Sequence, residues 1–179
     1  NESAQLVELL NRWPAPSEAP NLAPDECLAA METWQTLLQP SVNDGVYRCG
    51  FARNQAAYDR AERELFDALE QLEQALARQG PWLCGSRLTL ADVRLFPTLI
   101  RWEMVYAPLF GCTRRPLWQF PCLWEWRRRF FNLPGVAGSC DADAWRLDYF
   151  GALFPLNPGG IIPAGPDLST LVETPIPQP

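Results

Sequence analysis

At residues 88–96 the chain reads LTLADVRLF, and the apolar character continues to Tyr106. Thr89 and Asp92 lie three residues apart, so the Thr89 hydroxyl can accept from the Asp92 amide while the Asp92 carboxylate accepts from the Thr89 amide. The carboxylate also suits the positive end of a helix dipole. The spacing therefore predicts a capped helix that begins at this pair, and we expect the pair to serve folding rather than catalysis.

This helix is apolar around most of its circumference, which is typical of a helix buried among other helices. Its polar strip consists of Arg94, Thr98 and Arg101, which follow one face at steps of four and three residues. Pro97 falls well past the first turn, where it lacks the N–H that a regular helix needs. We therefore expect a kink or local unwinding at Pro97.

The sequence on either side predicts more helices and no strand, so we expect an all-α fold. The strongest helix signal is in residues 54–78, whose apolar residues are spaced three and four positions apart. Gly80 and Pro81 are expected to end this helix. We expect Pro40 and the Asn-Asp-Gly at 43–45 to end the preceding helix, and residues 107–116 to form a loop. The other predicted helices cover 3–13, 25–39, 117–132 and 141–150.

Proline-rich segments mark the predicted boundaries of the helical domain. Residues 14–24 contain four prolines and read as a linker. The helix at 1–13 would then belong to a unit that lies mostly upstream, and the helical domain would cover 25–154. Residues 155–179 are rich in proline and glycine, so we expect an extended, irregular tail.

Composition excludes several kinds of chemistry. All 15 cationic residues are arginine, and the chain has no histidine. A Schiff-base lysine, a histidine base and a histidine metal site are therefore excluded within it. The net charge of −6 argues against nucleic-acid binding.

Six cysteines are spread along the chain without a C-x-x-C pair. We expect reduced, mostly buried thiols in a cytoplasmic protein, and no metal site. No apolar run is long enough to span a membrane, and no signal peptide is evident. Because the chain begins at Asn1 without methionine, we expect it to be the later part of a longer polypeptide.

Five stretches, two of which overlap, resemble one family. Gly-x-x-x-Thr-x-Ala-Asp at 85–92 is similar to the helical domain of cytosolic glutathione transferases. Three stretches, together with the ADVRLF at 91–96, look like the glutathionyl-hydroquinone reductases, the Xi class: NESA at 1–4, NDGVYRCGFA at 43–52 and NPGGIIP at 157–163. The resemblance runs from residue 1 to about Asp167 and is weakest across the linker.

The resemblance implies a glutathione transferase-like helical bundle that follows a thioredoxin-like domain. That domain would carry the catalytic cysteine, in a Cys-Pro-x-Ala type of motif that this chain lacks, and residues 1–13 would be its last helix. In the family a Glu-Ser pair holds the γ-glutamyl end of glutathione, which assigns Glu2 and Ser3 to glutathione binding. The implied reaction removes glutathione from a glutathionyl-hydroquinone, with glutathione as co-substrate. The chain alone would be inactive.

Three of the four tyrosines match tyrosines of the family: Tyr47, Tyr106 and Tyr149. We expect them to line the aromatic-substrate site, since tyrosine hydroxyls are hydrogen-bond donors on rigid aromatic walls. Tyr47 could instead close a turn, and Tyr106 could be a core residue. Tyr58 falls on the core stripe of its helix. The chain departs from the family at Pro97, Asp148 and Pro108-Leu109, where small polar residues or histidines are usual, which puts the substrate preference in doubt.

Other features have simpler interpretations. The Arg127-Arg128-Arg129 run is typical of a solvated helix face or a subunit contact, and Cys49 of a structural thiol. The aromatic helix at 118–131 favours core or dimer interface, and we expect a homodimer. Two alternative functions remain open: a non-catalytic interaction or dimerisation module, and an omega-like thiol transferase domain.

Overall fold

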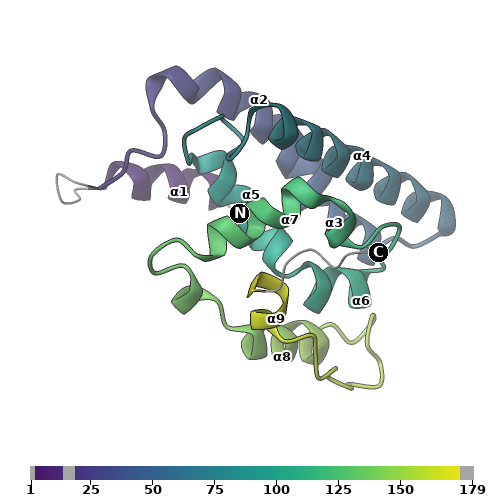
Figure 1. Cartoon of the computed structure of the whole chain (residues 1–179). Helices are drawn as coiled ribbons and strands as arrows, with labels where there is room; N and C mark the ends of the chain where they lie inside the picture. The colour runs from purple at the N-terminus through teal and green to yellow at the C-terminus, as the bar shows by residue number, and fades with distance from the viewer. Residues whose placement is uncertain (1–2, 14–18, 174–179) are drawn as a thin grey trace.

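The computed structural model describes residues 3–13 and 19–173 (Figure 1). Helices dominate it, and within this part of the chain there is no strand, only two isolated β-bridges near residues 82–87. The all-α prediction is therefore confirmed. The elements are α1 (Ser3–Arg12), η1 (Asp25–Cys27), α2 (Leu28–Leu38), η2 (Gln39–Asn43), α3 (Gly45–Gly50), α4 (Gln55–Gln79), α5 (Leu90–Ile100), η3 (Trp102–Tyr106), α6 (Ala107–Phe110), η4 (Leu117–Gln119), α7 (Pro121–Phe131), η5 (Ala137–Ser139), α8 (Ala142–Ala152) and α9 (Leu168–Glu173).

Helix α4 forms one wall of the core. Asn54 caps its start, with the side chain accepting from the Ala57 amide at 2.9 Å. Its predicted apolar stripe is buried, with Leu65, Leu69 and Leu72 at 0% exposure. The helix packs on α3 and α7, and Figure 1 shows α7 between α4 and α9.

Helix α5 begins at the predicted capping box. Asp92 is fully buried, and its carboxylate accepts from the Thr89 amide at 3.0 Å and from the Thr89 hydroxyl at 3.1 Å. The other carboxylate oxygen accepts from the Leu83 amide at 3.0 Å and the Trp126 indole at 2.8 Å. Burial raises the pKa of Asp92, and these hydrogen bonds oppose that rise. The pair thus joins α5 to α7 and to the chain before it.

Helix α2 ends at Leu38, directly before the break predicted at Pro40, but the chain does not leave the helical path there. After α2 the chain widens into the π-helical turn η2, in which the Asp44 amide donates to the Gln39 carbonyl at 2.9 Å, and then continues as α3. Pro40 lies at the start of that turn, where its missing N–H is tolerated. Tyr47 therefore lies on a helix rather than in a turn.

The irregularity expected at Pro97 occurs later. Helix α5 runs through Pro97 to Ile100, and the backbone changes at Arg101, whose φ is −92° and ψ is 1°. The π-helical η3 and the short α6 follow, so the loop predicted from residue 107 begins only at Gly111, with φ +73°.

The prediction that Arg127 is exposed is wrong, and the tail is irregular only in part. Arg127 is fully buried, where it pairs with Glu103 at 2.5 Å and donates to the Leu99 carbonyl at 3.2 Å. The tail is not irregular throughout, because residues 168–173 form α9 against α7 with Val172 buried. Residues 174–179 lie outside the described part. Within that part, none of the helices combines the length and the apolar character that crossing a membrane requires.

Candidate functional site

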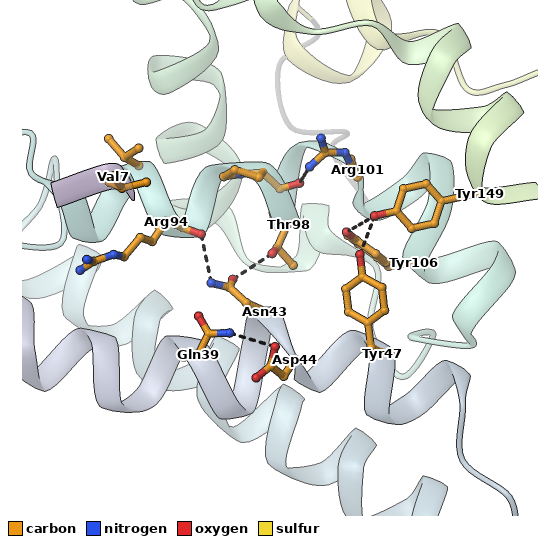
Figure 2. A pocket seen from close by; sticks show the side chains of 12 residues that line it. Val7, Gln39, Asn43, Asp44, Tyr47, Arg94, Thr98, Arg101, Tyr106 and Tyr149 are labelled. Carbon is orange, nitrogen blue, oxygen red and sulfur yellow. Dashed lines mark hydrogen bonds between the residues drawn. The ribbon is translucent and has the colours of Figure 1, made fainter. Parts of the chain in front are cut away.

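A cavity of about 370 Å³ opens between η2 and α3 on one side and α5, η3 and α8 on the other. Figure 2 shows the polar side chains that line it. All three tyrosines expected at the aromatic site reach it: Tyr47 from α3, Tyr106 from the end of η3 and Tyr149 from α8. The fold thus brings together residues that are 43 and 102 positions apart in the sequence.

The three phenol groups form one hydrogen-bonded cluster, which we call the tyrosine cluster (Tyr47, Tyr106, Tyr149). The Tyr149 hydroxyl lies 2.6 Å from that of Tyr47 and 3.1 Å from that of Tyr106. The rings also meet edge to face, with centroids 5.9 Å apart for Tyr47 and Tyr106 and 5.8 Å for Tyr106 and Tyr149. Edge-to-face packing restrains each ring and aims the hydroxyls at a common point.

Two phenols of the cluster, Tyr47 and Tyr106, have raised pKa values and so keep their protons at neutral pH. Burial raises the pKa of Tyr106, which is 3% exposed, and the hydrogen bond with Tyr149 raises it further. Burial also raises the pKa of Tyr47, which is 38% exposed. Three hydroxyl protons serve two internal hydrogen bonds, so at least one proton remains for a ligand in the cavity.

Asn43 positions the part of the cavity wall that α5 forms. Its amide donates to the Arg94 carbonyl at 3.2 Å and its oxygen accepts from the Thr98 hydroxyl at 2.9 Å. These bonds tie η2 to α5 and fix the polar strip of α5 at the cavity, where Arg94, Thr98 and Arg101 all lie. Asn43 is not among the site residues predicted from the sequence, although it opens the NDGVYRCGFA motif.

The predicted glutathione residues lie near the edge of the described structure. Glu2 is outside it, and Ser3 is the first residue of α1. Further along α1, Val7 lines the cavity and Glu8 pairs with Arg94 at 3.0 Å. Helix α1 therefore adjoins the cavity, and glutathione binding by Glu2 and Ser3 stays a prediction.

Cys49 lies near Tyr47 but does not face the cavity. It is 3% exposed and shares a hydrogen bond with Cys112, which lowers the pKa of Cys49, whereas this bond and burial raise that of Cys112. A thiol closed from solvent cannot attack a substrate. Within the described part, no cluster of three or more histidine, cysteine or acidic side chains is arranged to hold a metal ion.

Comparison with known proteins agrees with this architecture. The family model for the glutathione S-transferase C-terminal domain matches residues 55–129. Glutathionyl-hydroquinone reductase YqjG of Escherichia coli is 34% identical over 168 residues, which are 93% of this chain and 51% of YqjG. The chain spans about half the length of the curated relatives it matches.

Solved structures give the same result. The glutathione-bound structure of YqjG superposes with a TM-score of 0.88 at 34% identity, covering 98% of this chain and 57% of that one. The Xi glutathione transferase of Phanerochaete chrysosporium superposes with a TM-score of 0.86 at 33% identity, covering 93% of this chain and 58% of that one. By fold and by these similarities, the chain corresponds to the helical, C-terminal part of the Xi-class glutathione transferases that it resembles.

Proposed function

We propose that this chain is the helical, aromatic-substrate part of a glutathione-dependent reductase that removes glutathione from glutathionyl-hydroquinones. The observation that carries the proposal is the convergence of three tyrosine hydroxyls on one cavity. The names of similar proteins, including the glutathionyl-hydroquinone reductase of Escherichia coli, support the same reaction.

In this reaction a cysteine thiolate attacks the sulfur of the conjugated glutathione. A sulfur–sulfur bond forms, the bond between sulfur and the aromatic carbon breaks, and its electron pair stays on the ring. The ring carbon then takes a proton, and a second glutathione releases the first as glutathione disulfide. The tyrosine cluster would orient the ring hydroxyls and deliver the proton, since three hydroxyls share two internal hydrogen bonds and one donor is left for the ligand.

The nucleophile would come from an upstream thioredoxin-like domain. Helix α1 presents an apolar stripe to solvent, in which each residue is more than half exposed: Leu6, Leu9, Leu10 and Trp13. We propose that this stripe packs into that domain, because exposed apolar residues gathered on one helix face mark an interaction surface. Glutathione binding by Glu2 and Ser3, which the resemblance implies, is part of this proposal.

The test is hydroquinone release by the native gene product carrying Tyr47→Phe or Tyr149→Phe. Tyr58→Phe is the matched control, because the Tyr58 hydroxyl donates to the Gly111 carbonyl at 2.6 Å and does not line the cavity. Removing a proton donor costs about 10²-fold or more in rate. We expect a loss of that order for both cluster variants and near-normal turnover for the control. Unchanged turnover in both cluster variants would refute the tyrosine roles.

A non-catalytic dimerisation module is the second candidate. The observation that favours it is a set of large apolar side chains exposed on α8 and the segment after it: Leu147, Phe154, Ile161 and Ile162. Such residues are typical of a surface that a second copy covers. A native gene product that lacks a thioredoxin-like domain but forms dimers would favour this function over the reductase.

A further inference from the structure

Arg101 brings an uncompensated positive charge to the cavity. Arg94, the other cation in the lining, pairs with Glu8 at 3.0 Å. Among the residues that the structure describes, no carboxylate lies within ion-pair distance of Arg101. Asp44, the acidic side chain in the lining, accepts instead from the Gln39 amide at 2.9 Å.

The guanidinium of Arg101 is held in place without being neutralised. Its Nη1 donates to the Pro97 carbonyl at 2.8 Å, and its charged carbon lies 4.6 Å from the centre of the Trp145 ring. Its Nε is buried and has no hydrogen-bond acceptor. Stacking on a ring face and one carbonyl bond fix the orientation of the side chain. Among the described residues the guanidinium donates to one carbonyl, so its other terminal N–H groups can donate to a ligand in the cavity.

A purely structural role explains only part of this arrangement. The Arg101 amide turns to the Leu99 carbonyl, so the Pro97 carbonyl at the end of α5 is left for the side chain. Arginine at a helix C-terminus commonly serves this way. Capping needs one N–H group, however, and it does not account for the unpaired Nε or for a position that lines the cavity.

The charge acts on the tyrosine cluster. Arg101 opposes the rise in the pKa of Tyr47, so the two groups interact electrostatically. Figure 2 shows Arg101 near Tyr106 and Tyr149 at one end of the cavity. A ligand whose hydroxyl meets the cluster would therefore place a neighbouring ring substituent near the guanidinium.

We propose that Arg101 binds an anionic substituent of the aromatic ligand, so that the site prefers hydroquinones with a ring carboxylate over neutral ones. This inference rests on the proposed function of the tyrosine cluster and names its substrate class. Arginine binds carboxylates through charge-assisted hydrogen bonds, which are the strong ones. Inside this chain Arg114 binds Glu62 through Nε and Nη2, the same edge that Arg101 leaves without a carboxylate.

The experiment measures ligand binding to the native gene product by calorimetry at pH 7. The probes are 2,5-dihydroxybenzoate, neutral hydroquinone and S-methylglutathione. A hydrogen bond to a charged group is worth about ten-fold to a hundred-fold in affinity. We expect dihydroxybenzoate to bind tighter than hydroquinone by at least about ten-fold. Arg101→Gln should remove this preference, and Arg101→Lys, which keeps the charge, should retain part of it.

Arg129→Gln is the matched control. Arg129 also donates to a proline carbonyl, that of Pro81, at 3.1 Å and lies over a tryptophan, Trp82, but it is outside the cavity. This variant should keep the full preference. Thermal unfolding of each variant establishes that it is folded, and the preference of the unaltered chain needs no variant at all.

Three results would overturn the proposal. Equal binding of both phenols by the unaltered chain would do so, as would a preference that survives Arg101→Gln. An effect of Arg101→Gln on S-methylglutathione but not on dihydroxybenzoate would assign the guanidinium to a carboxylate of glutathione instead. With any of these three results, the proposed function would still stand if Tyr149→Phe weakens the binding of hydroquinone. No binding of either phenol would refute the aromatic site itself.

Discussion

Replacing Asp92 by asparagine should lower the free energy of unfolding by about 3 kcal/mol. The carboxylate is 0% exposed and accepts four hydrogen bonds, two on each oxygen. These bonds join the start of α5 to Trp126 of α7 and to Leu83. Asparagine has almost the same shape but replaces one acceptor oxygen with an NH₂ group.

The magnitude follows from what each oxygen binds. The least damaging orientation turns the NH₂ toward Thr89, whose hydroxyl can rotate to accept, so that the Thr89 amide alone loses its acceptor. A buried donor without a partner costs about 1–3 kcal/mol. The bonds from Leu83 and Trp126 persist but lose the negative charge, which weakens each by about 1 kcal/mol. Burial of the charge, which raises the pKa of Asp92, offsets part of this loss.

Urea unfolding followed by tryptophan fluorescence measures the change. Asp141→Asn is the control, because Asp141 caps α8 by accepting from the Ala144 amide at 2.9 Å on the exposed surface. Asparagine and aspartate are equivalent caps there, so we expect a change within about 0.5 kcal/mol. A loss below about 1 kcal/mol in Asp92→Asn, or a loss equal to the control's, would refute the reasoning.

Two further predictions concern packing and pH. Gly50→Ala would place a Cβ 2.5 Å from the Phe110 ring, so it should destabilise the protein by about 1–3 kcal/mol. At Gly151 in α8 a Cβ would meet nothing within 4 Å, so Gly151→Ala should stabilise the protein by about 0.5–1 kcal/mol. Thermal unfolding compares the two, and equal shifts would contradict the packing. The pKa of Tyr106 is raised in the folded protein. Its contribution to the free energy of unfolding is therefore complete below the ordinary tyrosine pKa of about 10. Above that pH the free energy of unfolding falls by up to about 1.4 kcal/mol per pH unit. Urea unfolding from pH 9 to 11 should show a smaller decline in Tyr106→Phe, and an identical decline would contradict the burial of this phenol.

The spacing of capping and apolar residues along the chain predicted two main helices of the fold, α4 and α5. Thr89 and Asp92 predicted the start of the buried helix α5. The apolar residues in 54–78, spaced three and four positions apart, predicted α4 to within one residue at each end. Both signals are local, since capping bonds and helical stripes depend on neighbours within one or two turns. The convergence of the tyrosines was expected from family resemblance rather than from any local pattern.

The errors arose where tertiary contacts outweigh local preference. A proline within a helix usually ends it. Here α2 ends at Leu38, but the π-helical turn η2 accommodates Pro40 and leads directly into α3. Arg127 was placed on the surface because it sits in a run of three arginines. Its spacing of four from Leu123 and three from Phe130, both buried, put it on the core face, so a stricter reading of the helical period would have found it.

Asn43 and Arg101 show what the sequence could not give. Asn43 acts through a carbonyl and a hydroxyl more than fifty residues away, and no local pattern reports such bonds. Arg101 was recognised only as part of a polar strip. Its lack of a carboxylate partner became evident once the neighbours in the cavity were known, because Arg94 there pairs with Glu8 and Asp44 accepts from the Gln39 amide.

The most direct test of the central claim is glutathione-dependent release of hydroquinone from a glutathionyl-hydroquinone by the native gene product, with its intact mass determined on the same sample. We predict a chain longer than these 179 residues by about 100 residues or more, and one glutathione disulfide formed for each hydroquinone released. A product that carries a cysteine-bearing thioredoxin-like domain yet releases no hydroquinone would contradict the account.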